Sequence, residues 1–308
     1  MTNVTAGMVK DLREKTGAGM MDCKAALAET GGEVEAAVDW LRKKGLAKAA
    51  KKAGRVAAEG LVGVTVAGHS GAAIEVNSET DFVARNETFK AFVKESARLA
   101  LQSGGDVAKL VAMNLATGST VQETLTELIA KIGENMSVRR AAVLSVTPGI
   151  VASYVHNAVA PDIGKMGVLV ALRSSADPAK LAALGKQLAM HIAAAAPLAV
   201  TPGELPADVV ARERSVQGDL ARQSGKPENV VEKMIEGRMR KFYEESVLQS
   251  QVFVIDGETP VAKIVEQAAK DFGAPVEIAG FVRFAVGEGV DRPDGGDFAG
   301  EVKAMAGH

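Results

Sequence analysis

The feature of this sequence that most constrains its fold is a change in the spacing of apolar side chains close to residue 60. Before that point, apolar residues recur every three or four positions, which is the period of a helix. After it, the stretches 61–66 and 72–77 alternate with a period of two on either side of Gly68-His69-Ser70-Gly71. Period-two stretches joined by a glycine-containing turn are typical of a β-hairpin. The sequence therefore predicts a helical module followed by a core that contains a sheet.

The N-terminal module is predicted to hold three short helices within residues 1–54. Thr5 can cap the first helix, and Thr16-Gly17-Ala18-Gly19 is expected to end it. The third helix is expected to begin near Glu33 and to end at Gly45. A bundle of this size is typically used to present one helix face to a partner.

A basic, alanine-rich connector follows this module. Two interpretations are open: a solvated linker helix, which we prefer, or a surface that contacts RNA. The net charge of −2 does not support a general phosphate-binding surface, so no direct nucleic-acid binding is expected. The cationic residues of the connector are Lys43, Lys44, Lys48, Lys51, Lys52 and Arg55.

The rest of the chain predicts two related α+β halves. In the first, a capping box at Thr120-Val121-Gln122-Glu123 starts a helix, and residues 138–146 have the pattern of a strand. A similar order recurs in the second half, so we expect an α+β fold with a two-halved core. The segments that repeat this order are strands 150–156 and 166–172, helix 178–194 and strand 278–286.

A charged stretch with helical period interrupts the second half between about residues 206 and 249. It is broken at Gln223-Ser224-Gly225-Lys226-Pro227, which predicts an antiparallel helical hairpin, a short coiled coil. The apolar seam is expected to be formed by Val209, Val216 and Leu220 against Val230, Val231, Met234, Ile235 and Met239. The predicted boundaries are 1–54 for the helical module, 55–146 for the first core half, 147–204 and 250–286 for the second, 205–249 for the hairpin, and 287–308 for a C-terminal module with a short closing helix.

Nothing in the sequence is typical of an enzyme active site. The histidines do not stand at metal-ligand spacings with carboxylates, so structural or interface roles are preferred for them. Gly17-Ala18-Gly19 lacks the preceding strand and the third glycine of a dinucleotide fingerprint. Cys23 is the only cysteine, which fits a reducing compartment. We therefore expect no catalytic residue, no metal site and no cofactor. The four histidines are His69, His156, His191 and His308.

The N-terminus has no basic stretch followed by an apolar run, and no run of eighteen apolar residues passes without a charge or a helix breaker. These features predict a cytoplasmic protein without a membrane segment.

The segment Thr80-Asp81-Phe82-Val83 is different from the rest, because it places an aromatic residue at a turn between a strand and a helix. Local chemistry favours a structural interpretation. Thr80 can cap the following helix, and Phe82, seven residues before Phe89, can pack on the same helix face as a hydrophobic staple. The alternative is that Phe82 is displayed to a partner.

This segment and several others resemble the elongation factor Ts family along nearly the whole chain. The stretches that carry the resemblance are 12–24, which reads Leu-Arg-Glu-Lys-Thr-Gly-Ala-Gly-Met-Met-Asp-Cys-Lys, then 80–86, 131–135 (Lys-Ile-Gly-Glu-Asn), 167–170, 190–191, 223–227 and 234–239. Several matches in the same order make the probability of a chance agreement very small.

The resemblance implies a guanine-nucleotide exchange factor that binds elongation factor Tu, both with GDP and without nucleotide. It implies that Thr80, Asp81, Phe82 and Val83 disturb the Mg²⁺ and phosphate site of that GTPase, with Asp81 acting by charge or by capping. The N-terminal module would be of the UBA-like kind. The chain departs from the family at 157–162, which is longer than the turn expected after His156. Further contacts with elongation factor Tu are implied for Leu12, Arg13, Met20, Met21, His156, Gly167, Val168 and Leu169.

Two other functions compete with this one. The first is a binding or scaffold protein associated with RNA or the ribosome, which uses the connector and the helical hairpin. The second is an enzyme whose site is not recognised. Homodimerisation through the hairpin is also open.

Overall fold

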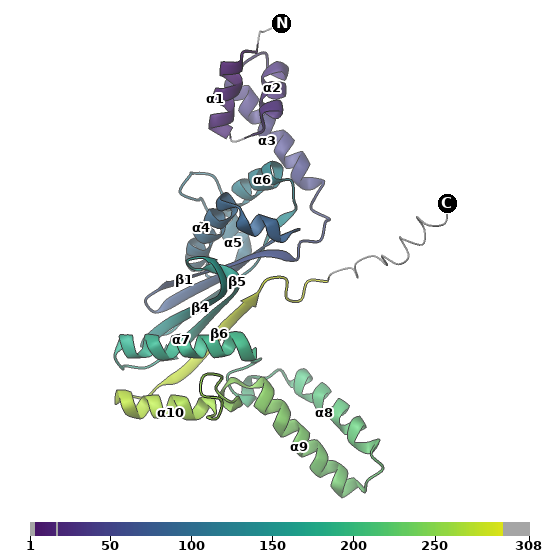
Figure 1. Cartoon of the computed structure of the whole chain (residues 1–308), viewed down its shortest axis with the longest axis vertical. Helices are drawn as coiled ribbons and strands as arrows, with labels where there is room; N and C mark the ends of the chain where they lie inside the picture. The colour runs from purple at the N-terminus through teal and green to yellow at the C-terminus, as the bar shows by residue number, and fades with distance from the viewer. Residues whose placement is uncertain (1–3, 17, 292–308) are drawn as a thin grey trace, which may run out of the picture. The chain divides into compact units, whose positions relative to one another are not determined.

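The computed structural model of this chain describes residues 4–16 and 18–291 (Figure 1). Its internal contacts divide these residues into two units. The first contains 4–16, 18–62, 74–141 and 285–291, and the second contains 63–73 and 142–284. Gly17, His308 and the closing helix predicted within 287–308 lie outside the described residues. The predicted α+β class is confirmed.

The first unit holds the N-terminal helices and the helices that follow the hairpin. Its helices are α1 (Ala6–Thr16), α2 (Met20–Glu29), α3 (Val34–Ala50), the 3₁₀ helix η1 (Asp81–Arg85), α4 (Glu87–Ser103), α5 (Val107–Ala112) and α6 (Val121–Ile132). Strands β1 (Glu59–Ala67), β2 (Ser70–Ser78) and β3 (Met136–Ser145) belong partly to each unit.

The second unit holds the remaining strands and helices, apart from Ala285, the last residue of β6, which belongs to the first unit. Its strands are β4 (Gly149–Ala160), β5 (Ile163–Arg173) and β6 (Glu277–Ala285), and its helices are α7 (Pro178–Ala195), η2 (Pro202–Glu204), α8 (Ala207–Arg222), α9 (Glu228–Ser246), η3 (Leu248–Ser250) and α10 (Val261–Phe272).

The strands form a sheet in the order β3-β2-β1-β5-β4, and β6 also pairs with β5. The predicted hairpin is confirmed as β1 and β2, which are joined at Gly68 and His69. Strands β4 and β5 are antiparallel, with Gly149 opposite Arg173 and His156 opposite Met166. The register shifts between Ala158 and Ala160, where the sequence departs from the family pattern.

The N-terminal helices pack around a small apolar core. The Thr5 hydroxyl accepts the Met8 N–H at 3.3 Å, which confirms the predicted cap of α1. The prediction that Gly45 ends α3 is wrong, because α3 continues to Ala50. A Cβ at Gly45 would lie 3.4 Å from the Cβ of Ala130 on α6, so the small residue allows close helix packing instead of a break. The buried core residues are Leu12, Cys23, Ala26, Leu27 and Ala37.

In the second unit, α7 lies against β4 and β5, and its apolar face merges with that of α10 (Figure 1). Asp177 caps α7 by accepting the N–H groups of Ala179 and Lys180 at 2.8 and 3.1 Å. Fully buried residues of this core include Val168, Val170 and Leu172 of β5, Leu188 and Ile192 of α7, and Val261 of α10.

The predicted helical hairpin is present as α8 and α9, but its seam differs from the expected one. Val216 and Leu220 are each 47 % exposed, whereas Gly218 and Ala221 are buried. A Cβ at Gly218 would lie 3.7 Å from Cδ1 of Ile235. Small residues bring α8 close to α9, so the contact face is rotated away from the larger apolar residues. On α9 the expected residues Val231, Ile235 and Met239 are buried.

Candidate functional site

The segment 80–83 forms an exposed tip between β2 and α4. We call residues 80–83 the tip. Thr80 is extended, with φ −122°, and η1 begins at Asp81. Phe82 is 70 % exposed, whereas Val83 is only 3 % exposed. The Arg85 guanidinium lies 5.8 Å from the centroid of the Phe82 ring. The tip therefore displays one aromatic ring to solvent and is anchored from below by Val83.

The predicted cap and staple are wrong. The side chain of Thr80 makes no capping hydrogen bond, and the cap of α4 is Asn86, whose Oδ1 accepts the N–H groups of Thr88 and Phe89 at 2.9 and 3.1 Å. Because the chain turns through η1 before α4 begins, Phe82 and Phe89 do not share a helix face. Phe89 is fully buried, and Phe82 is free for another role.

The tip is held from behind by the turn that follows α6. The Glu134 carboxylate accepts the Thr80 N–H at 2.8 Å and the Thr80 hydroxyl at 2.6 Å. The neighbouring Asn135 N–H donates to Glu79 at 2.5 Å. The Ser78 hydroxyl donates to the Thr80 carbonyl at 2.9 Å. The residues before Asp81 are thus fixed by partners more than fifty positions away in sequence.

The sequence did not connect Glu134 and Asn135 with the tip. Both stood in a stretch that resembled the family, but no local pattern relates them to Thr80. Only strand pairing and the end of α6 bring the two segments together. The sequence does place a carboxylate, Glu134, directly after the glycine expected at the end of a helix. This pattern does not indicate which residue the carboxylate binds.

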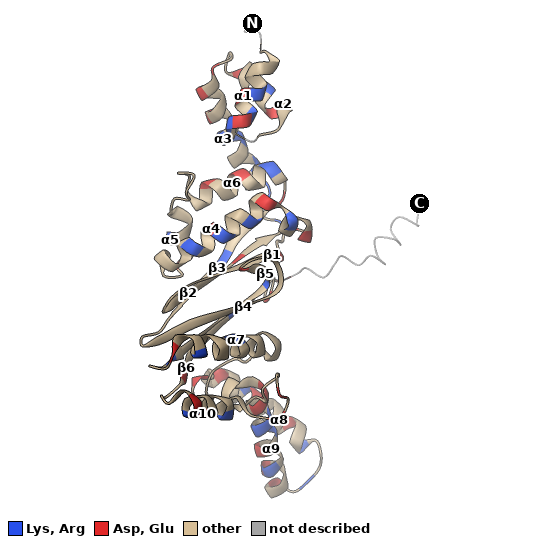
Figure 2. Cartoon of the chain, turned by 60° about the vertical axis from the view of Figure 1, so that its left-hand side comes forward, with Lys and Arg blue, Asp and Glu red and all other residues tan. Residues whose placement is uncertain are grey.

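Most cations of the basic connector are paired within the first unit. Lys44 and Lys48 donate to Asp22 at 3.0 and 2.9 Å. The hydrogen bonds from Lys48 and Lys44 hold the pKa of Asp22 below its usual value. Lys52 donates to the Gly133 carbonyl, and Arg55 lies 3.5 Å from Glu79. Figure 2 shows positive and negative residues interspersed along α3 and α6. These contacts hold the C-terminal part of α3 and the residues that follow it against the rest of the first unit.

The other implied contact residues are divided between surface and core. Arg13, Met20 and Met21 are exposed, with Met21 at 74 %. Leu12 is fully buried in the core of the N-terminal helices. A buried side chain reaches a partner only after a local rearrangement, so Leu12 supports this surface from inside.

A similar division holds on β4 and β5. His156 is exposed on β4, and its Nδ1 lies 3.1 Å from the Tyr154 hydroxyl. Gly167, Val168 and Leu169 are buried on β5. Their contacts with a partner stay a prediction, and in the free chain their burial stabilises the strand that pairs with β4.

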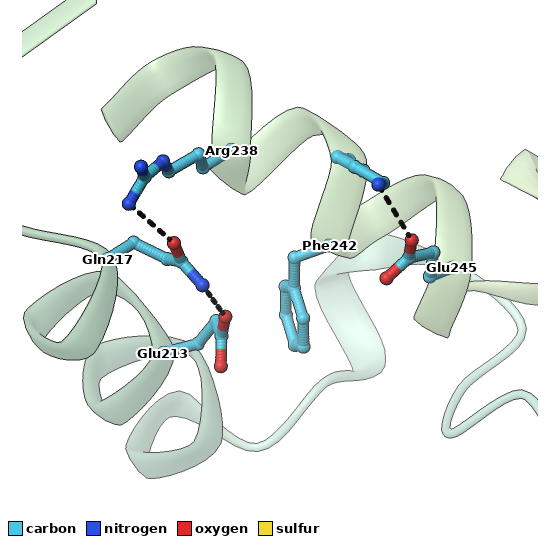
Figure 3. A pocket seen from close by; sticks show the side chains of 6 residues that line it. Glu213, Gln217, Arg238, Phe242 and Glu245 are labelled. Atoms are coloured by element: carbon cyan, nitrogen blue, oxygen red, sulfur yellow. Dashed lines mark hydrogen bonds and ion pairs between the residues drawn. The ribbon is translucent and has the colours of Figure 1, made fainter. Parts of the chain in front are cut away.

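An open pocket of about 300 Å³ lies between α8 and α9 (Figure 3). Arg238 donates to Gln217 at 3.2 Å, and Gln217 donates to Glu213 at 2.7 Å. Lys241 lies 3.6 Å from Glu245. The polar groups at its rim are thus bonded to one another, and no nucleophile with an adjacent base lines it.

No group of three or more His, Cys, Asp or Glu residues within 4–16 and 18–291 has an arrangement that could hold a metal ion. None of the helices in these ranges is both long enough and apolar enough to span a membrane.

Comparison with known proteins agrees with the resemblance stated above. The model of the family described as "Elongation factor TS" matches residues 79–288, which include the tip. A protein of Rhodospirillum centenum named elongation factor Ts is 62 % identical over 308 residues, which is all of both chains. Proteins of the same name from Rhodospirillum rubrum and Maricaulis maris are 60 % and 59 % identical over at least 99 % of each chain. From these end-to-end matches it follows that the chain belongs to the elongation factor Ts family.

Proposed function

We propose that this protein is the guanine-nucleotide exchange factor of elongation factor Tu in translation elongation. It binds the GDP complex of that GTPase, disturbs the Mg²⁺ and phosphate site, and releases GDP so that GTP can bind. It acts by binding alone, without covalent chemistry or a cofactor of its own. The observation that carries the proposal is an aromatic side chain, Phe82, that is 70 % exposed on a tip whose first residue, Thr80, is held by two hydrogen bonds.

The binding free energy that the tip can contribute is too small to account for the release of GDP. An exchange factor and GDP weaken each other's binding by the same factor, and such couplings are typically about 1–3 kcal/mol or more. Burial of one Phe side chain contributes about 1.5–3 kcal/mol. Further docking surfaces must contribute the remainder, and the exposed residues Arg13, Met20, Met21 and His156 are the proposed ones. GTP then enters because it is in excess in the cell.

Asp81 is exposed and lies beside Phe82. Within the described residues its carboxylate accepts no hydrogen bond, so the capping alternative has no geometric support. Placed near a GTPase phosphate site, a free carboxylate would weaken Mg²⁺ and phosphate binding by competition and repulsion. We assign Asp81 this electrostatic role.

Stopped-flow release of fluorescent GDP from elongation factor Tu tests the proposal. We expect Phe82→Ala to lower the rate of GDP release with no change in the thermal unfolding midpoint. Ile255→Ala, which removes an apolar side chain that is 49 % exposed in the second unit, is the control. GDP release by Phe82→Ala at the wild-type rate would contradict the proposed role of the tip.

A scaffold protein that binds RNA predicts a different result. It would show salt-sensitive RNA binding and would leave GDP release unchanged. The pairing of Lys44, Lys48 and Lys52 inside the first unit leaves few cations on the connector for that function.

A further inference from the structure

We infer that Glu134 is a positioning residue of the tip: it fixes Thr80 and thereby the direction in which Phe82 is presented. This inference rests on the proposed exchange function and adds a residue to its machinery. The observation behind it is that one carboxylate, from the turn after α6, accepts both hydrogen-bond donors of Thr80.

The geometry gives this contact its effect. Oε2 of Glu134 accepts the Thr80 N–H at 2.8 Å, and Oε1 accepts the Thr80 hydroxyl at 2.6 Å. A bidentate contact to a backbone and a side-chain donor of the same residue fixes its φ and χ1 together. The Thr80 carbonyl is fixed as well, by the Ser78 hydroxyl at 2.9 Å. Every polar group of Thr80 thus has a partner before the chain enters η1.

Glu134 is itself held in place. Helix α6 ends at Ile132, and the next residue, Gly133, has φ +92° and an N–H that donates to the Ile129 carbonyl at 2.9 Å. The carbonyl of Gly133 accepts a hydrogen bond from Lys52. We call residues 133–135 the clamp turn.

The far end of the clamp turn is anchored as firmly as the near end. The N–H of Asn135 donates to Glu79 at 2.5 Å, and its side-chain amide donates to the Arg55 carbonyl at 2.7 Å. Glu134 therefore projects from a turn bound on both sides to residues of the same unit.

Positioning matters because Phe82 has little support of its own. Its ring is mostly exposed, and its direction depends on the backbone that leads into η1. If Thr80 is released, the tip populates several directions, and only a fraction of molecules presents Phe82 correctly. The rate of any step that needs the correct direction of Phe82 falls in proportion to that fraction. Docking through other surfaces is unaffected.

The test measures GDP release from elongation factor Tu over a range of concentrations of this protein. We expect Glu134→Ala to lower the maximal rate about tenfold, because the loss of hydrogen bonds to a charged group shifts a conformational equilibrium by about this factor. The half-saturating concentration should stay unchanged. Glu134→Gln can still accept the Thr80 N–H and donate to its hydroxyl, so it should restore most of the rate.

Glu204 provides a matched control in the second unit. Its carboxylate accepts the Val200 N–H at 3.2 Å and the Thr201 hydroxyl at 2.9 Å, the same pair of donor types. Glu204→Ala should shift the unfolding midpoint about as much as Glu134→Ala and leave GDP release unchanged. If Glu134→Ala does not fold, Thr80→Val, which removes only the hydroxyl, replaces it, and Thr80→Ser is its rescue.

A double-mutant cycle separates this inference from the proposed function. If Glu134 acts through Phe82, Glu134→Ala should slow release in the wild-type background and have no further effect in Phe82→Ala. Equal slowing in both backgrounds, or an increase in the half-saturating concentration alone, would overturn the positioning role. If Phe82→Ala itself has no effect, the proposed function of the tip fails instead.

Discussion

Glu75 and Arg139 form an ion pair between β2 and β3 in which the carboxylate has no exposed surface. Nη1 of Arg139 lies 3.1 Å from both carboxylate oxygens. Arg140 donates from Nε at 2.5 Å, and the Asn77 amide and the Gly287 N–H donate at 2.9 and 2.8 Å. A buried charge is tolerated only when it is paired and fully hydrogen-bonded, and this one joins β2, β3 and the segment after β6.

We predict that Glu75→Ala lowers the free energy of unfolding by about 3–5 kcal/mol, because it removes the acceptor shared by Arg139 and Arg140, whose side chains are only 26 % and 29 % exposed. Urea denaturation followed by circular dichroism measures this. Glu266→Ala, which breaks an exposed pair with Lys263 at 2.7 Å, is the control and should leave the midpoint unchanged. Equal effects of the two substitutions would contradict the structural role of Glu75.

We predict that Asn86 contributes more to the stability of α4 than any residue of the tip does. Asn86→Ala should cost about 0.5–2 kcal/mol, since two N–H groups at the start of α4 lose their acceptor. Asn86→Asp keeps an acceptor oxygen and should recover most of the loss. Thermal denaturation of the two variants checks this, and an unchanged midpoint for Asn86→Ala would show that α4 needs no cap.

Two helix glycines should respond to alanine in opposite directions. A Cβ at Gly185 on α7 would lie 2.5 Å from the Cβ of Ala152 on β4, so Gly185→Ala should destabilise by about 1–3 kcal/mol. Gly237 on α9 has nothing within 4 Å of its Cβ position. Gly237→Ala should therefore stabilise by about 0.5–1 kcal/mol. A higher unfolding midpoint for Gly185→Ala than for the wild type would contradict the packing of α7 on β4.

The burial of His191 leads us to predict that the stability of the protein depends on pH. It is fully buried, its Nε2 lies 2.9 Å from Oε1 of Gln251, and its Nδ1 accepts the Val254 N–H at 3.2 Å. Gln251 donates its amide to Ala195 and Glu245 carbonyls, so its oxygen faces His191 and the imidazole is neutral with Nε2–H. Burial lowers the pKa of His191 below its ordinary value, and the bond to Gln251 opposes that shift only in part.

Because the pKa of His191 is lowered in the folded chain, the stability of the fold should decrease as the pH falls. In the unfolded chain His191 binds a proton below its ordinary pKa of about 6.5, whereas the folded chain resists protonation. The contribution to stability is complete above that pH and is lost as the pH falls toward the folded-state pKa. The free energy of unfolding, measured between pH 7.5 and 5, should fall less steeply in His191→Gln than in the wild type. Equal slopes for the wild type and His191→Gln would contradict this role of His191.

The sequence was sufficient for features set by neighbours along the chain. The alternation around Gly68 identified β1 and β2, and the capping box at Thr120 and Glu123 started α6 where it was expected. Such features depend on local hydrogen bonds and on side-chain period, both of which can be seen in one sequence.

The features that the sequence did not predict depend on distant partners. Gly45 looked like a helix end, but Ala130 on α6 makes it a packing position. Leu220 looked like a seam residue, but the small Gly218 and Ala221 bring α8 to α9 on another face. The tip was identified at once, yet its support by Glu134 depends on a contact across 54 positions. None of these contacts has a local signature.

The cap of α4 by Asn86 has a consequence for how substitutions at the tip accumulate. Because the helix begins without help from Asp81 or Phe82, the fold exerts little selection on those two positions. Substitutions there, in natural relatives or in a mutant library, should be filtered by the partner protein alone. At Val83, Ala84 and Asn86, which are buried or serve as the cap, they should be filtered by folding. Adjacent residues of one short loop thus record two independent selective pressures.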